Sequence, residues 1–183
     1  MKKQKIIAIV GSIRQNSLNL QLAKEAGRLI GEQADFELLE FTDVPFFNQD
    51  IEYPAPDSVT RVRNKVKEAD AIWFFCPEYN HSFPGVLKNL IDWLSRPISE
   101  NEPQVLKGKP AAVSGISLGM SGGVVAQDSL VSLISMLNMK IMNQPRLSIP
   151  NAWQQTDTDG KLILTDSLSH LEKQVKAFLC FIV

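Results

Sequence analysis

The sequence predicts one α/β domain built on a doubly wound, five-stranded parallel sheet with strand order 2-1-3-4-5 and helices on both faces. Short apolar runs alternate along the chain with segments in which apolar residues recur at helical spacing. The runs are continuously apolar, as expected of strands that are buried on both faces. Right-handed crossovers leave few strand orders, and this order places its switch point between the first and third strands.

Ten segments account for the predicted sheet and its helices. Strands are expected at residues 6–10, 36–41, 71–76, 111–116 and 139–142. Helices are expected at about 17–31, 57–69, 84–94, 124–138 and 168–179.

Several of these segments carry recognisable signals at their ends. Gly31 is a stop signal for the first helix, Asp57 can cap the second, and Pro84 suits the first turn of the third. The run 71–76 is the most apolar stretch of the chain and stops at Pro77, so it is expected to be a central, buried strand.

A proline-rich segment, residues 45–56, is long for a connection inside a compact domain. Long ordered loops are often functional or lie at interfaces. Its aromatic residues Phe46, Phe47 and Tyr53 are expected to wall a pocket or to pack on a neighbouring subunit, or else to fold back on their own domain.

Length and composition indicate a single domain, residues 1–183, with 44% hydrophobic and 21% charged residues and a net charge of −1. No basic patch predicts nucleic acid or a membrane as a partner. The basic start, residues 1–5, precedes an apolar run that is too short for a signal peptide or a membrane span. Cys76 and Cys180 lack metal-ligand spacing, so no metal is expected, and a reducing cytoplasm is the expected location.

The first polar loop, Gly-Ser-Ile-Arg-Gln-Asn-Ser, joins the first strand to the first helix and suits a phosphate group. Gly11 permits a sharp turn and the close approach of a ligand, and the helix N-terminus favours an anion. Ser12 and Ser17 supply hydroxyl donors, and Arg14 supplies a planar fork of donors that matches phosphate oxygens. The alternative is a solvated turn in which Ser17 or Asn16 only caps the helix.

Two further polar loops follow the third and fourth strands. Residues 77–85 hold aromatic and amide groups between two prolines, and residues 117–123 contain three glycines that let the backbone lie against a flat ligand. In the predicted topology all three loops converge on one crevice. A large flat ring with a phosphate tail would satisfy all of them.

These loops resemble those of the flavodoxin-like NAD(P)H-dependent FMN reductases, a family that includes quinone, azo-dye and chromate reductases. The matching stretches are 11–17 with Asn19, 77–80 running into 84–89 with 92–93, and 117–119 with 122–123. The second stretch is the most specific. The resemblance covers residues 5 to about 138.

The resemblance implies that FMN is the cofactor and implies which residues bind it. The phosphate would be held at the first loop by Ser12, Arg14, Ser17 and Asn19. The isoalloxazine ring would lie along the other two loops, largely through backbone groups of Pro77, Glu78, Tyr79 and Asn80, with Ser117 and Gly119 bordering it.

The resemblance also implies an enzyme. NAD(P)H would pass a hydride to N5 of FMN and leave, and a small-molecule electron acceptor would then take its place. No side chain is expected to be an indispensable acid, base or nucleophile, while backbone N–H groups near Tyr79 and Asn80 would stabilise charge on the ring. Family members are usually homodimers or homotetramers with FMN near the interface, so residues 45–56 would face the partner. The expectation that the enzyme prefers NADPH over NADH rests only on the resemblance to the family.

Four residues near these motifs have a separate interpretation. His81 is a weak candidate for proton donation to a quinone. Cys76 is expected to be an inert buried thiol, and Glu78 is expected to brace its loop rather than to bond the ring. Trp93 is expected in the core or at an interface.

Three other functions fit the same fold. A flavodoxin-type electron carrier without direct NAD(P)H oxidation is the main alternative, but such carriers are usually strongly acidic. A cysteine phosphatase needs a thiol in the first loop and a phosphoacceptor domain needs Mg²⁺-binding acidic residues there, and the loop has neither. A domain that keeps the fold but has lost flavin is the third alternative.

Overall fold

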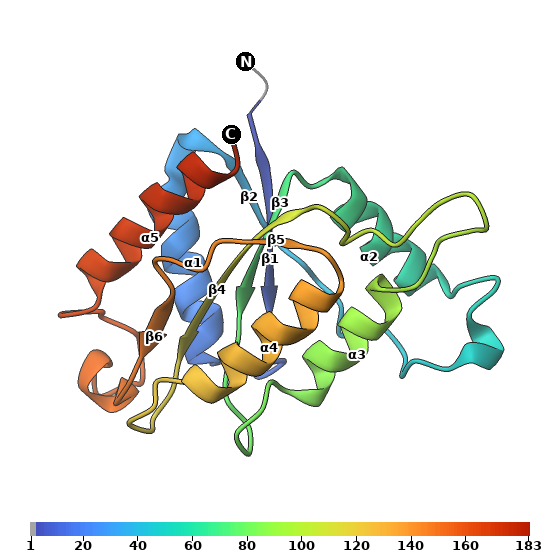
Figure 1. Cartoon of the computed structure of the whole chain (residues 1–183). Coiled ribbons are helices and arrows are strands. Elements are labelled where there is room, and N and C mark those ends of the chain that lie inside the picture. Colours follow the sequence, from blue (N-terminus) through green and yellow to red (C-terminus); the bar gives the residue numbers. More distant parts are fainter. Residues whose placement is uncertain (1–2) are drawn as a thin grey trace.

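A parallel sheet in the order β2-β1-β3-β4-β5 forms the middle layer of the computed structural model, which describes residues 3–183 (Figure 1). All pairings in it are parallel. A sixth strand, β6, also pairs with β4. The predicted fold class and strand order are therefore confirmed, and one strand is added.

The elements lie close to their predicted positions. The strands are β1 Lys5–Val10, β2 Asp35–Leu38, β3 Ala71–Phe75, β4 Pro110–Ile116, β5 Lys140–Ile141 and β6 Leu147–Ile149. The helices are α1 Leu18–Ile30, α2 Asp57–Glu68, α3 Gly85–Leu94, α4 Val124–Met136 and α5 Leu168–Phe181. Within the described part of the chain, no helix has both the length and the apolar character that a membrane span requires.

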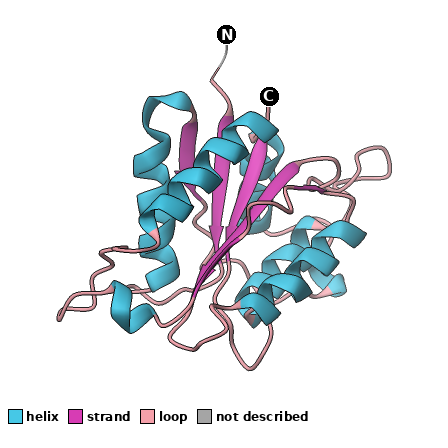
Figure 2. Cartoon of the chain, turned by 60° about the vertical axis from the view of Figure 1, so that its left-hand side comes forward, coloured by secondary structure: helices cyan, strands magenta, loops and turns pink. Residues whose placement is uncertain are grey.

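Helices cover both faces of the sheet (Figure 2). Because successive side chains of a strand point to opposite faces, each strand contributes to two cores. Along β1, Ile7 and Ile9 pack into the core made with α2, α3 and α4, whereas Ile6 and Ala8 pack into the core made with α1 and α5. Burial on both faces explains why the strands read as unbroken apolar runs.

The far edge of the sheet differs from the prediction. β5 has two residues instead of the predicted 139–142, and β6 was not predicted. β5 pairs with the beginning of β4 and β6 with its end, so the two short strands share one edge position. Pro145 lies between them, and it cannot donate a ladder hydrogen bond.

Of the three predicted end signals, Gly31 is confirmed, whereas Asp57 and Pro84 are each displaced by one residue: Pro84, expected in the first turn of α3, is its N-cap. Ser17 is the N-cap of α1, with its Oγ accepting the N–H of Leu20 at 3.4 Å, and Gly31 is the C-cap. Asp57 was expected to cap α2, but it is the first helical residue, and Pro56 occupies the N-cap position without a side-chain cap bond. A proline with its fixed φ can lead into a helix without any side-chain hydrogen bond.

Hydrogen bonds hold the proline-rich loop before α2 against α3. The Asn89 side chain donates to the Pro45 carbonyl at 2.9 Å and accepts the N–H of Phe47 at 2.7 Å, and Trp93 Nε1 donates to the same carbonyl at 2.8 Å. Phe47 packs edge-on against the buried Trp93 ring, whereas Phe46 is 85% exposed. Phe47 therefore folds back on its own domain, and Phe46 does not.

Candidate functional site

The loops after β1, β3 and β4 meet at the carboxyl ends of the strands, at the lower end of the molecule in Figure 1. They enclose a hollow of about 430 Å³ with a largely polar lining. Nine of the ten predicted site residues line it, all except Asn80. The lining also includes Leu18, Ile116, Leu118 and Ser121, which sequence reasoning did not select although each lies within two residues of a selected one.

Gly11 brings β1 close to the loop that follows β3. Its N–H donates to the carbonyl of Phe75 at 2.8 Å. A Cβ at this position would lie 3.0 Å from Pro77 Cδ and 3.2 Å from Leu87 Cδ2, which is tighter than most real contacts. The missing side chain therefore lets the first and second loops touch.

Two hydroxyl groups and a guanidinium surround the start of α1. Ser12 Oγ accepts the N–H of Arg14 and Ser17 Oγ accepts that of Leu20, each at 3.4 Å, so both hydroxyl hydrogens remain free to be donated. Arg14 is exposed and forms no ion pair within residues 3–183. The first turn of α1 carries no acidic residue, so the charge distribution favours an anion.

Asn19 joins the first loop to the third. Its buried side chain donates to the Ile116 carbonyl at 3.0 Å and accepts the Ile116 N–H at 3.2 Å. This reciprocal pair holds the start of α1 against the end of β4. An amide has two N–H donors, so a contact between Asn19 and a phosphate stays a prediction.

The second loop contains a two-residue hairpin. Tyr79 and Ser82 exchange backbone hydrogen bonds of 2.9 and 3.1 Å across Asn80 and His81. Both central residues have positive φ, 51° and 59°, as a type I′ turn requires. Glycine is favoured at the second of these positions, so His81 holds a strained backbone there, and such strain is common at functional sites.

Glu78 braces the second loop from inside, as the sequence predicts. Its carboxylate accepts the N–H of Ala126 at 3.1 Å and the hydroxyl of Ser121 at 3.4 Å. His81 Nδ1 lies 3.7 Å from the oxygen that also contacts Ser121. The carboxylate thus links the loop to the third loop and to the beginning of α4.

Cys76 follows β3 and is fully buried. Burial raises the pKa of its thiol to about 12, and the nearby Glu78 carboxylate adds to the increase. A thiol with this pKa is not ionised at neutral pH and is no nucleophile. The expectation of an inert buried thiol is confirmed.

β6, the strand that sequence analysis missed, supports the third loop. The N–H of Ser117 donates to the Ile149 carbonyl, and the N–H of Ala152 donates to the Ser117 carbonyl, both at 3.0 Å. Gly122 has φ 63°, and a Cβ there would lie 3.0 Å from the backbone of residues 148–150. The loop therefore lies directly against β6 and the residues that follow it.

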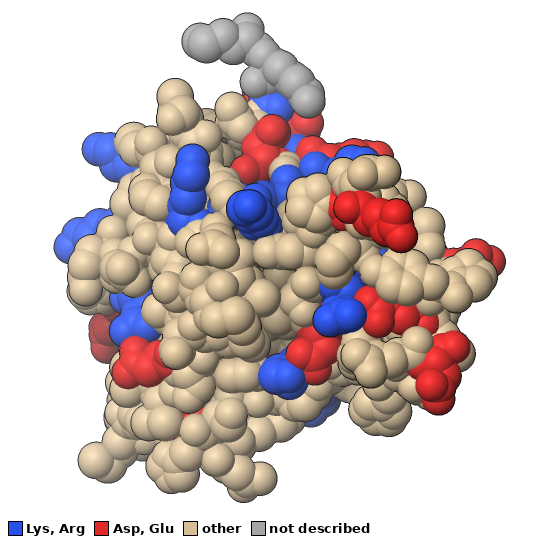
Figure 3. Space-filling view, turned by 45° about the vertical axis from the view of Figure 1, so that its right-hand side comes forward, with Lys and Arg blue, Asp and Glu red and all other residues tan. Residues whose placement is uncertain are grey.

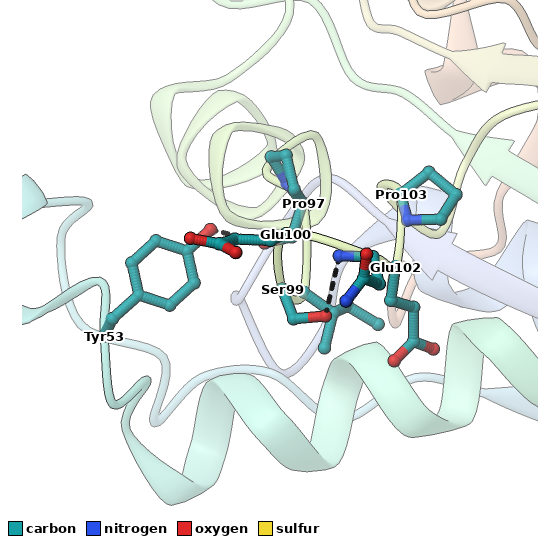
Figure 4. A pocket seen from close by; sticks show the side chains of 8 residues that line it. Tyr53, Pro97, Ser99, Glu100, Glu102 and Pro103 are labelled. Atoms are coloured by element: carbon teal, nitrogen blue, oxygen red, sulfur yellow. Dashed lines mark hydrogen bonds between the residues drawn. The ribbon is translucent and has the colours of Figure 1, made fainter.

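A larger hollow, about 710 Å³, lies between Tyr53 and residues 97–103 (Figure 4). The Tyr53 hydroxyl donates to the carbonyl of Pro97 at 2.7 Å. Glu100 and Glu102 line this hollow, and their charges would repel a phosphate. None of the three convergent loops contributes to it, so its size does not make it the better candidate.

Comparisons with known proteins identify the family. The sequence profile of the NADPH-dependent FMN reductases matches residues 4–154. A 2-hydroxy-1,4-benzoquinone reductase of Burkholderia sp. is 34% identical over 168 residues, which are 92% of this chain and 90% of that protein. An NAD(P)H-dependent FMN reductase of Pseudomonas aeruginosa is 36% identical over 174 residues, 94% of this chain and 92% of the relative.

Among solved structures, FerB from Paracoccus denitrificans, a flavoenzyme NAD(P)H:(acceptor) oxidoreductase, matches with a TM-score of 0.87 and 35% identity. The match covers 98% of this chain and 97% of FerB. The chain belongs to the NADPH-dependent FMN reductase family. It is an oxidoreductase that uses FMN as its cofactor and NAD(P)H as its electron donor.

Proposed function

We propose that this protein reduces a small quinone with NAD(P)H in a ping-pong sequence through FMN bound where the three loops meet. The observation that carries this proposal is that the free donors of the first loop and residues of the second and third loops line one hollow. The family supports the cofactor and the donor, and the quinone is suggested by relatives that are named quinone reductases.

The donor set at the first loop fits the FMN phosphate. Ser12 and Ser17 each have a free hydroxyl hydrogen, and in the described part of the chain no carboxylate pairs with Arg14. The N-terminus of α1 adds unpaired backbone N–H groups and a positive field. Asn19 would contribute through its second N–H while it keeps the first and third loops together.

The slot between the second and third loops fits a flat ring. We place the isoalloxazine along the backbone of residues 77–80, with Ser117 and Gly119 on its border. A hollow of about 430 Å³ lies within the range of cofactor sites. The hairpin across Asn80 and His81 fixes this backbone before the ring binds, so its N–H groups are preorganised.

Bound FMN supplies a ring that accepts a hydride at N5 and passes electrons to an acceptor. The side chains named here bind and orient it. Of the backbone N–H groups near Tyr79 and Asn80, that of Tyr79 is already donated to the Ser82 carbonyl, so the N–H of Asn80 is the one that favours the negative charge on the ring. This division of labour assigns no catalytic acid, base or nucleophile to the chain.

Exposed apolar side chains lie on the second and third loops: Tyr79 and Leu118 line the hollow, and Met120, in the third loop, is 86% exposed. In Figure 3 the lower end of the molecule shows mostly uncharged surface. Such a surface suits both a flat acceptor and a second subunit, so we propose a homodimer or homotetramer. Both cysteines are free, as is usual for a protein of the reducing cytoplasm, which we propose as its location.

Initial-rate kinetics test the proposed reaction. The FMN-loaded enzyme is assayed with NADPH and 1,4-benzoquinone varied together, and a ping-pong sequence gives parallel double-reciprocal lines. Intersecting lines would contradict it. If NADPH and NADH both leave the bound flavin oxidised while a separate reductase reduces it, the protein is a flavodoxin-type carrier instead.

A further inference from the structure

Glu78 is an almost buried carboxylate that has no lysine or arginine partner among residues 3–183. Its side chain is 12% exposed, and the one ion pair that residues 3–183 give it is with His81 at 3.7 Å. Its two hydrogen bonds come from a hydroxyl and a backbone N–H. A buried carboxylate needs such donors to compensate for lost hydration, so this side chain is held in a defined position.

The backbone donor belongs to the first turn of α4. The N-cap of α4 is Gly123, at φ 82°, and it provides no side-chain cap. Glu78, 48 residues earlier in the chain, accepts the N–H of Ala126 instead and places a negative charge at the positive end of the helix. The cap of α4 therefore comes from the second loop.

This arrangement couples the position of the second loop to α4. The hairpin that follows Glu78 is closed by the two backbone hydrogen bonds between Tyr79 and Ser82, which fix its shape. Gly123 lies close beneath the loop, where a Cβ would come within 3.8 Å of Glu78 Cβ. The Glu78 carboxylate connects these parts by accepting hydrogen bonds from Ser121 in the third loop and from Ala126 in α4.

We propose that Glu78 is a positioning residue whose carboxylate clamps the second loop onto the start of α4 and thereby sets the distance between the backbone N–H of Asn80 and the FMN ring, because the N–H of Tyr79 is already donated to Ser82. The proposal rests on the placement of FMN given above. It assigns Glu78 no direct bond to the ring.

Two variants separate positioning from charge. Glu78→Gln removes the charge but keeps an amide oxygen that can accept the Ala126 N–H. Glu78→Ala removes both. The readouts are the FMN dissociation constant from fluorescence quenching of the apoprotein, the visible circular dichroism of bound FMN, and the midpoint potential of the bound flavin.

We expect Glu78→Gln to keep the wild-type dichroism and to bind FMN with nearly wild-type affinity. Glu78→Ala is expected to weaken FMN binding about tenfold, the scale of one lost hydrogen bond to a charged group. It should also change the dichroism and have a midpoint potential more negative than that of Glu78→Gln, because an Asn80 N–H that lies farther away stabilises the negative charge of the reduced ring less well.

Other outcomes would overturn the proposal. Equal potentials in the two variants would mean that Glu78 acts only through its charge. A lower melting temperature of Glu78→Ala with unchanged dichroism and potential would mean that it is only a helix cap. If Glu78→Ala does not fold, Ser121→Ala removes one of the two hydrogen bonds and keeps the carboxylate. It should change the dichroism in the same direction, and an unchanged spectrum would contradict the clamp.

Failure of the proposed function is recognised separately. If wild-type protein bound no FMN, the cofactor placement would be wrong, and the proposal for Glu78, which rests on it, would be overturned with it. If wild-type protein binds FMN and Glu78→Ala behaves like wild type in all three readouts, only the clamp is refuted.

Discussion

The side chains of the crevice differ in whether their hydrogen-bonding groups are free. Ser12, Ser17 and Arg14 keep donors available for a ligand, whereas the Asn19 amide and the Glu78 carboxylate are engaged in holding loops together. The sequence shows which residues can donate or accept. It does not show which groups are already used, because the partners of Asn19 and Glu78 lie 97 and 48 residues away.

Arg14 is the positive side chain of the first loop, and its removal tests the phosphate site. Arg14→Ala is expected to weaken FMN binding by about 1.5–3 kcal/mol, the scale of a hydrogen bond to a charged group. The measurement is a fluorescence titration of apoprotein with FMN. Arg28→Ala is the matched control, because Arg28 lies at the other end of α1, where it pairs with Glu25. Equal affinities of the two variants would reject the assignment of Arg14.

The end of α3 is tied to the proline-rich loop by a second type of contact, an ion pair. Arg96 donates to both carboxylate oxygens of the nearly buried Glu52, at 2.7 and 3.3 Å. The hydrogen bond from Arg96 lowers the pKa of Glu52, against the opposing effect of burial. A lowered pKa stabilises the folded state above the unfolded-chain value and ceases to do so as the pH falls through the folded-state value.

Glu52→Gln is therefore expected to be less stable than wild type at pH 7. The difference should shrink as the pH falls from about 5 towards 3, across and below the unfolded-chain pKa of glutamate. The difference in the free energy of unfolding is measured by urea denaturation of both proteins at a series of pH values. Glu32→Gln, at an exposed position, serves as the control. A difference that stays constant over this range would show that the pair does not contribute through ionisation.

The spacing of apolar residues predicts where strands and helices lie along the sequence. It does not predict which of these elements contact one another. The continuous apolar run of β3 and the helical spacing in α1 predicted both within two residues. β6 has only three residues and shares its edge position with β5, so no apolar run distinguishes it. The support that β6 gives to the third loop was invisible in the sequence for this reason.

Close packing of β4 against Cys76 and α4 gives a prediction for two glycines. A Cβ at Gly115 would lie 2.5 Å from the Cys76 carbonyl oxygen and 3.0 Å from Gln127 Nε2, whereas one at Gly85 would meet nothing within 4 Å. Gly115→Ala is expected to lower the free energy of unfolding by about 1–3 kcal/mol, as overpacking does. Gly85→Ala, in α3, should be neutral or stabilising. Urea denaturation measures the free energy of unfolding of both variants. Equal values would contradict the close approach of Gly115 to Cys76.

For the whole molecule, the parallel sheet explains why three loops from different parts of the chain form one site. Strand order 2-1-3-4-5 places the carboxyl ends of β1, β3 and β4 side by side. The sequence could predict this order because buried parallel strands and right-handed crossovers leave few alternatives. It could also predict which loops would meet, and nine of ten selected residues line the hollow. Asn80 lies outside the lining, in the turn of the hairpin.

The central claim is that these loops bind FMN in a form that NAD(P)H reduces directly. The most direct measurement is the visible absorbance spectrum of the purified protein, saturated with FMN and freed of excess, before and after anaerobic addition of NADPH. We predict a protein-bound flavin spectrum that is bleached by NADPH without any partner protein. A protein that retains no flavin, or a bound flavin that neither NADPH nor NADH bleaches, would contradict the account.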